Sequence, residues 1–586
     1  MKKTLARMLA LLLALLLLCG CAAPAVPEEA AGPEPQTKPV QTEPIQPAPA
    51  QPEPVQTEET PEPDEQPPTL VGGGYLPEVY HPELPFAEMQ PSTLTREDAQ
   101  RLCRACTEAA QSGSQAEFHR AFTAAFEMLY ELECASSLYT LRSNADAENE
   151  ALLKQAADSE ALLNEADDLF FSALETISRS EGSRLLKKEA PEWLYSIIID
   201  YNADDSAEWL CLSERETKTE QEYERLSVDD PMNRQAIGNA FLELVQTRKQ
   251  IAALNGYADF PAYAYEVLYG RTYTPADAEA VWKTAKEDFA PIFWRHIREV
   301  QNKLMHAEIS ADCSEEAVVR ALDEGCAVLS PELHEICEYM IRNGLYDLSA
   351  SEKKLDIGYT VWLSVYDVPF IFSAGENAYP DYQTLFHEFG HFVGAFCHGS
   401  DAMFGTCDLD LSELQSQGME VLFLERYDEI FGQALADALI AEKVLDFVYS
   451  ILTGAMFDEF QQRVYREPEL TTEKINTIYA ELRREYGFAD EPGCEYRWMD
   501  VIHNFEYPLY YISYAVSAFP TLELFLRQRE SPADAADAYL RIAAMGDEEY
   551  TLEEVIRSSG FVDVLRTHSG YLIADALENC GVFDGF

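Results

Sequence analysis

Residues 384–394 read TLFHEFGHFVG, and this short stretch places His387 and His391 four positions apart. On an α-helix, residues i and i+4 share one face and lie about 6 Å apart along the axis. Two imidazoles at that spacing can bind one Zn²⁺ through nitrogens at roughly 2.0–2.1 Å. Glu388, directly after the first histidine, can face a water at the metal without occupying the metal itself. The pattern predicts a zinc-binding helix that also carries a general base.

A catalytic zinc needs three protein ligands, and the sequence offers two candidates for the third. One known pattern reads His-Glu-x-x-His-x-x-Gly-x-x-His. Here Gly394 fits, but Cys397 takes the last position and His398 follows one residue late. The other candidate is Glu413, in a second predicted helix. The spacing alone leaves both candidates open.

The second helix is predicted over residues 408–427, DLDLSELQSQGMEVLFLERY. Glu413 and Glu420 are seven positions apart and share one face. Their neighbours Met419 and Val421 are apolar, which indicates a buried helix rather than a solvated one. Packed against the first helix, this one could deliver Glu413 to the metal while Glu420 accepts a hydrogen bond from a ligand histidine. Such a bond fixes the tautomer and orients the ring.

The regions before these motifs predict mostly helix with a small sheet. Residues 356–375, DIGYTVWLSVYDVPFIFSAG, are rich in aromatic and β-branched residues and predict one or two short strands, whose free edge could pair with an extended peptide. From about Thr95, apolar residues recur at three- and four-residue spacing, which predicts long helices. We expect an N-terminal helical region over 86–350 and a catalytic region over 351–586.

With these motifs in view, the chain resembles the thimet oligopeptidase/oligoendopeptidase F family of zinc metallopeptidases. TLFHEFGH is followed by a second motif that in the family reads Phe-x-Glu-x-x-Ser-Gln, with another glutamate downstream. The positions that match the second motif are Leu411, Glu413, Ser416, Gln417 and Glu420. The stretches 248–268 and 503–518 also resemble the family. The resemblance covers roughly residues 95–580.

The resemblance implies a mostly α-helical zincin-type fold with a small β-sheet and a deep substrate channel. It also implies zinc-dependent endopeptidase activity on short unstructured oligopeptides, with one Zn²⁺ per chain. The roles it implies are His387, His391 and Glu413 as metal ligands, Glu388 as general base, Glu420 as the hydrogen-bond partner of a ligand histidine, and His503, Tyr511 and Tyr514 as donors to the oxyanion.

The sequence also permits two alternative interpretations. The first is a different zinc peptidase that uses His398 as its third ligand. The second is a non-catalytic peptide-binding lipoprotein, but the presence of Glu388 argues against it, because pure binding needs no general base.

The N-terminus predicts export and anchoring. Residues 1–20 combine basic residues with an apolar run too short to span a bilayer comfortably, as in a signal peptide. The stretch LCGC ending at Cys21 resembles a bacterial lipobox, with Cys21 as the lipidated residue. A linker over 21–85 follows, and 14 of the 31 prolines lie between Pro24 and Pro68, which predicts an extended chain. We expect a lipoprotein on the extracytoplasmic face of a bacterial membrane.

Composition limits the classes of partner. The chain has 43 Lys and Arg against 103 Asp and Glu, a net charge of −60, which excludes a nucleic-acid backbone as partner. Apolar residues make up 47% and charged residues 25%, as in globular proteins. The expected partners are therefore oligopeptide substrates and the membrane.

Overall fold

The computed structural model describes residues 75–586 except 78, 80, 192–193, 196–197, 199–206, 229, 308, 401–406 and 567–568. The predicted signal peptide, the predicted lipidation site Cys21 and most of the predicted linker lie outside the described residues. Within the described part of the chain, no helix is both long and apolar enough to cross a membrane. The prediction of a mostly helical fold with a small sheet is confirmed.

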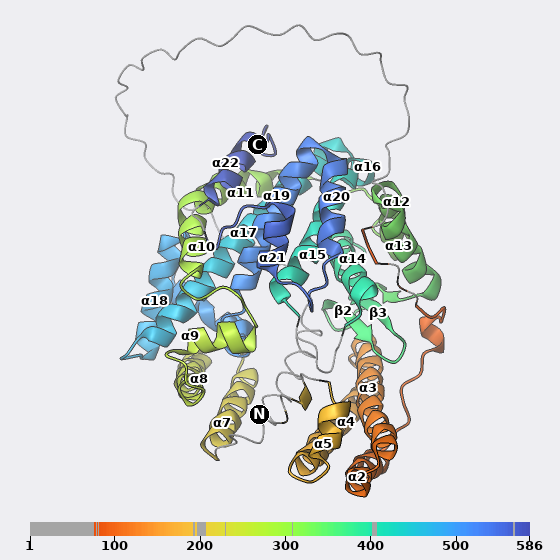
Figure 1. The fold of residues 1–586 in the computed structure, drawn as a ribbon. Coiled ribbons are helices and arrows are strands. Elements are labelled where there is room, and N and C mark those ends of the chain that lie inside the picture. Colours follow the sequence, from red (N-terminus) through yellow and green to blue (C-terminus); the bar gives the residue numbers. More distant parts are fainter. Residues whose placement is uncertain are drawn as a thin grey trace.

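The first group of helices has a core of its own (Figure 1). Its helices are α2 (Arg96–Ser112), α3 (Gln115–Ala145), α4 (Glu150–Ser178) and α5 (Ser183–Glu189). Thr95 begins α2 with a capping box, in which its hydroxyl accepts from the backbone N–H of Asp98. Phe118, Phe122 and Phe170 pack inside this group. In Figure 1 these orange and tan helices project from one side of the body.

A second group of helices belongs to the large core that also contains the His-Glu-x-x-His helix. Its helices are α7 (Ala207–Glu224), α8 (Arg234–Leu254), α9 (Phe260–Tyr263), α10 (Ala278–Thr284), α11 (Ala290–Met305), α12 (Glu315–Leu329) and α13 (Pro331–Asn343). Of these, α12 and α13 pack against α14, and α10 and α11 pack against α17. The large core therefore runs through both halves of the chain, and the predicted boundary near residue 350 stays a prediction.

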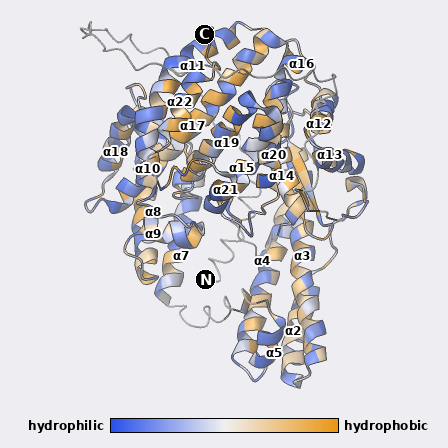
Figure 2. Ribbon diagram, turned by 45° about the horizontal axis from the view of Figure 1, so that its top comes forward, coloured by the Kyte–Doolittle hydropathy of each residue, from blue (hydrophilic) through white to orange (hydrophobic). Residues whose placement is uncertain are grey.

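The small sheet has the strand order β1-β3-β2. Its strands are β1 (Tyr346–Asp347), β2 (Gly358–Leu363) and β3 (Val368–Ser373). The central strand β3 is buried along its whole length, pairs antiparallel with β2 and packs against α14. The strands beside α14 are coloured as apolar in Figure 2. The prediction of one or two short strands before the His-Glu-x-x-His helix is confirmed as two strands, β2 and β3, and β2 lies at an edge of the sheet.

The C-terminal half is a layered helical body around α15. Its helices are α14 (Pro380–His398), α15 (Leu409–Phe423), α16 (Tyr427–Phe431), α17 (Gln433–Arg466), α18 (Thr472–Glu485), α19 (Ile512–Glu530), α20 (Pro532–Ala543), α21 (Leu552–Ser559) and α22 (Tyr571–Asn579). α15 packs against α14 and against α19 (Figure 1). It is buried on nearly every face, as expected of a central helix.

Candidate active site

Helices α14 and α15 approach each other closely at Gly390, inside the His-Glu-x-x-His motif. A Cβ atom at this position would lie 2.5 Å from Cα of Ser416 and 2.7 Å from the carbonyl oxygen of Gln415. Both distances are far below van der Waals contact, so only glycine allows this backbone approach. The contact brings the turn of α15 that carries Glu413 beside the two histidines of α14.

His387, His391 and Glu413 form a group whose potential ligand atoms all lie within 4.8 Å of one another. Nε2 of His387 lies 4.0 Å from Oε2 of Glu413. Nε2 of His387 and Nε2 of His391 are both buried and have no hydrogen-bond partner among the described residues. Two imidazole nitrogens and one carboxylate make a donor set that suits a catalytic zinc site. The residues present therefore fit a zinc ion.

The outer nitrogen of His387 is held by Glu420. Nδ1 of His387 lies 2.9 Å from Oε1 of Glu420, and Lys443 on α17 donates to the other carboxylate oxygen at 2.7 Å. Burial raises the pKa of Glu420, but Lys443 and His387 outweigh it and lower that pKa to about 2. Glu420 is therefore ionised, accepts from Nδ1 and leaves Nε2 facing the metal position. The sequence predicted Glu420 as the hydrogen-bond partner of a ligand histidine. It did not predict that Lys443 contacts Glu420, because no motif includes this lysine.

The outer nitrogen of His391 has a different support. Its Nδ1 lies 3.2 Å from the hydroxyl of Ser412, and the carboxylate of Asp547 accepts a hydrogen bond from the same hydroxyl. One hydroxyl can accept from an N–H while it donates to a carboxylate. This chain of bonds selects the His391 tautomer that presents Nε2 to the metal position. Burial lowers the pKa of His391 well below its ordinary range, which also favours the neutral ring.

Glu388 is oriented by the sheet. The hydroxyl of Thr360 on β2 lies 2.8 Å from Oε2 of Glu388 and 3.0 Å from the backbone carbonyl of the same residue. Glu388 is 1% exposed, and burial raises the pKa of its carboxyl to about 7. A carboxylate whose pKa lies near neutral can both accept and return a proton. The motif itself does not predict Thr360, because Thr360 lies 28 residues before Glu388 and meets it only in the folded protein.

His398 does not join this group. It is the last residue of α14, and its Nε2 lies 2.9 Å from the carbonyl oxygen of Ala543. The structure therefore favours Glu413 over His398 as the third residue beside the two histidines.

His503 and several tyrosines form one aromatic cluster. The ring of His503 lies 4.9 Å from that of Tyr511 and 6.2 Å from that of Tyr514, measured between centroids. Burial lowers the pKa of His503 to about 4, so its ring is neutral at pH 7. Burial also raises the pKa of Tyr511, which keeps its hydroxyl protonated and able to donate. Tyr507 and Tyr510 complete the cluster around His503.

The register between α15 and α19 places this cluster relative to Glu413. Gln417 donates to the hydroxyl of Ser517 at 3.2 Å, and further along Gln528 donates to the carbonyl of Leu422 at 3.0 Å. The two helices therefore run parallel. Glu413 lies four residues before Gln417 on α15, and Tyr514 lies three residues before Ser517 on α19, so both precede the same contact between the two helices.

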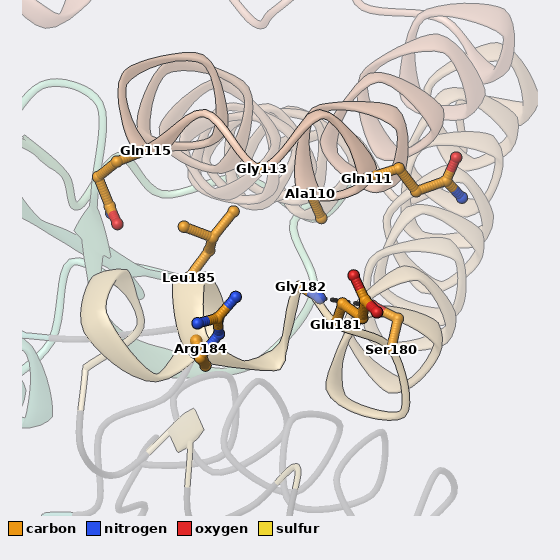
Figure 3. Close-up of a pocket in the computed structure, with 9 residues that line it drawn as sticks. All are labelled: Ala110, Gln111, Gly113, Gln115, Ser180, Glu181, Gly182, Arg184 and Leu185. Carbon is orange, nitrogen blue, oxygen red and sulfur yellow. Dashed lines mark hydrogen bonds between the residues drawn. The ribbon is translucent and has the colours of Figure 1, made fainter.

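A separate surface pocket lies in the group of helices α2 to α5 (Figure 3). It has a volume of about 610 Å³ and opens between the α2–α3 turn and the α4–α5 turn. Its lining includes Gln111, Glu181 and Arg184 but no histidine or cysteine. It therefore offers no alternative metal site.

A mostly helical body that packs a His-Glu-x-x-His helix against a glutamate from the next helix is the architecture of a metallopeptidase. Residues 330–557 match the family model described as Peptidase family M3. This region of the chain belongs to peptidase family M3, and the resemblance to the oligoendopeptidases is confirmed. None of the curated proteins matches the chain.

Solved structures share the fold over most of their length. A protein named as an oligoendopeptidase F aligns with a TM-score of 0.65 at 19% identity, covering 86% of this chain and 99% of that chain. PZ peptidase A, solved with an inhibitor, aligns with a TM-score of 0.63 at 20% identity, over 84% and 98% of the two chains. A protein named as a peptidase from Chlamydophila abortus gives 0.61 at 15% identity, over 85% and 100%. At these identities the likeness establishes the fold.

Proposed function

We propose that the chain is a zinc-dependent endopeptidase that hydrolyses short, unstructured oligopeptides. One observation carries the proposal: His387, His391 and Glu413 converge within 4.8 Å, and the carboxyl of Glu388 is buried one residue from the first of them. A binding protein needs no such base, whereas hydrolysis does.

The ligand residues would hold Zn²⁺, and Glu388 would move the proton. When bound, zinc polarises the scissile carbonyl and lowers the pKa of a coordinated water from 15.7 towards about 7. Glu388 accepts the proton of the attacking water and passes it to the leaving amine. Thr360 keeps the carboxylate of Glu388 in one orientation during both transfers. Tyr511, Tyr514 and neutral His503 supply N–H or O–H donors for the oxyanion.

The sheet edge supports an extended peptide as substrate. Among the strands of the described residues, β2 pairs only with β3, and it carries Thr360 next to the proposed base. A peptide bound along the free edge would present its backbone as an added strand. The deep channel that the resemblance implies would admit such an extended peptide and exclude a folded protein.

Metal analysis and peptide cleavage test this function together. The purified chain should contain one equivalent of zinc and cleave a quenched fluorescent peptide, and a chelator should abolish both. Glu388→Gln should keep the zinc and lose at least about 10²-fold in kcat, the lower range for general-base catalysis. Normal turnover in a zinc-loaded Glu388→Gln variant would contradict the role of Glu388. Peptide binding without cleavage by the zinc-loaded wild-type chain would instead favour a peptide-binding lipoprotein.

We also propose that the enzyme is anchored to a bacterial membrane through lipidated Cys21. The support is the sequence: a signal-like apolar run, the LCGC stretch and the proline-rich linker. Cys21→Ser should release the protein from the membrane fraction or leave an unprocessed precursor. Unchanged membrane fractionation of this variant would exclude the lipid as the anchor.

A further inference from the structure

The segment that joins His503 to α19 is held by side chains from a distant part of the chain. Tyr269 donates from its hydroxyl to the carbonyl of Pro508 at 2.9 Å. Nη1 of Arg271 donates to the carbonyl of Leu509 at 2.9 Å, and Nη2 donates to the hydroxyl of Ser513 at 2.8 Å. The bonds of Arg271 to this segment join residues 238 to 242 positions apart in the sequence. They fix the backbone between His503 and the first turn of α19.

The centre of this segment is strained. Leu509 has φ of 66°, in the left-handed region that non-glycine residues seldom occupy. Such a conformation costs roughly 1–3 kcal/mol and persists only where the surroundings over-determine it. Here the carbonyl of Leu509 accepts from Arg271, and its N–H donates to Oε1 of Gln461 on α17 at 3.0 Å. The bend separates Tyr507 from Tyr511, so it sets where the tyrosines point.

The same guanidinium reaches the metal-ligand helix. Nε of Arg271 lies 3.8 Å from Oδ2 of Asp410, and the hydroxyl of Tyr273 donates to that oxygen at 2.7 Å. Asp410 is in the first turn of α15, three residues before Glu413. The Arg271 side chain is 3% exposed, and the rings of Tyr265 and Tyr269 lie 4.6 and 4.5 Å from its guanidinium carbon. One buried cation thus contacts both α15 and the His503–Tyr514 segment.

We propose that Arg271 is a positioning residue that holds the donors of the His503–Tyr514 segment in register with Glu413. The inference rests on the proposed function, because those donors matter only when a peptide carbonyl becomes an oxyanion at the metal. A displacement of about 1 Å at a reacting group can cost roughly 10²-fold in rate. A lysine at position 271 keeps the charge, but it lacks the planar fork with which Arg271 bonds Leu509 and Ser513 while its Nε lies 3.8 Å from Asp410.

The test is a double-mutant cycle on zinc-loaded enzyme, with kcat, KM, zinc content and melting temperature measured for each variant. Arg271→Lys should lower kcat by about tenfold to 10²-fold with KM and zinc content close to wild type. In a Tyr514→Phe background, Arg271→Lys should lower kcat only a few-fold, because the hydroxyl donor that Arg271 positions is already absent. Arg527→Lys is the matched control: Arg527 also donates to two backbone carbonyls, those of Ser559 and Gly560, and should leave kcat unchanged.

Smaller changes keep the inference testable if Arg271→Lys does not fold. Ser513→Ala removes the hydroxyl that accepts from Arg271, and Tyr273→Phe removes the hydroxyl that donates to Asp410, the carboxylate beside Arg271. Each change should lower kcat while the melting temperature stays near wild type. A wild-type kcat in both Ser513→Ala and Tyr273→Phe would overturn the inference. So would an equal loss of kcat on Arg271→Lys in the wild-type and Tyr514→Phe backgrounds. If Tyr514→Phe and His503→Ala both turn over at the wild-type rate, the inference falls while the zinc peptidase function stands. An inactive wild-type chain would overturn the function itself.

Discussion

The hydroxyl of Thr360 lies 2.8 Å from Oε2 of Glu388, so a side chain of the edge strand β2 touches the proposed general base on α14. This bond is the direct link between the sheet and the proposed chemistry. Because the Glu388 carboxyl is 1% exposed, the fold supplies the hydrogen bond that water would otherwise provide.

Thr360→Val should lower kcat while zinc content and KM stay close to wild type. The change removes one hydroxyl and preserves the branched shape. A hydrogen bond to a charged group contributes about 1.5–3 kcal/mol, which corresponds to roughly 10- to 10²-fold in rate. Thr477→Val, an exposed threonine that bonds only its own helix, is the control. Equal kcat values for the two variants would remove Thr360 from any role in orienting Glu388.

Glu413→Ala should lose zinc, whereas His398→Ala should keep it. Glu413 lies in the group with the two histidines, while His398 bonds the carbonyl of Ala543 at the end of α14. Zinc content after dialysis and peptide turnover distinguish the two assignments. Loss of zinc in His398→Ala with retention in Glu413→Ala would reverse them.

Ser412→Ala and Asp547→Asn should weaken zinc binding through His391. Partners that orient a ligand histidine typically account for 10- to 100-fold in metal affinity. The measurement is a competition titration with a fluorescent zinc chelator, which reports affinity without any turnover. Asp537→Asn, which changes a half-buried carboxylate paired with Arg541 on α20, is the control. Wild-type affinity in both test variants would show that the Ser412 hydroxyl does not hold the ring.

Asp167→Asn should stabilise the protein at pH 8 and have little effect at pH 4. Asp167 is buried in the α2–α5 core, Oδ1 has no hydrogen-bond partner among the described residues, and burial raises the pKa of the carboxyl to about 7. An unfolded aspartate has a pKa of about 3.9. The folded protein therefore binds the Asp167 proton more tightly than the unfolded chain does. The stability that comes from this difference is fully present below about pH 4 and is lost as the pH rises through about 7.

Chemical denaturation at the two pH values checks this prediction. Each unit of pKa difference corresponds to about 1.36 kcal/mol, so the gain at pH 8 should be about 1–4 kcal/mol. Asp168→Asn changes the exposed neighbour and should leave the pH dependence in place. The same pH dependence in Asp167→Asn and the wild-type chain would contradict the prediction.

The sequence predicted the elements of the site better than their connections. The helices around His387 and Glu413 and the strands before them were confirmed as α14, α15, β2 and β3, because each has a clear periodicity over its own length. Thr360 was missed because its bond to Glu388 crosses 28 residues and depends on how the sheet packs. Asp547 and Arg271 were missed for the same reason: no local pattern marks a side chain whose partners lie more than a hundred positions away.

The long reach of Arg271 has a consequence for biosynthesis. Its bonds to Leu509 and Ser513 close only after the chain has been made to residue 513, and Tyr273 reaches Asp410 across 137 positions. Contacts this distant in sequence form late in folding, since the chain must first close long loops. A nascent chain that already carries the His-Glu-x-x-His helix would therefore lack the positioned donors. The enzyme would acquire its peptidase activity only once its C-terminal quarter had folded back onto the N-terminal half.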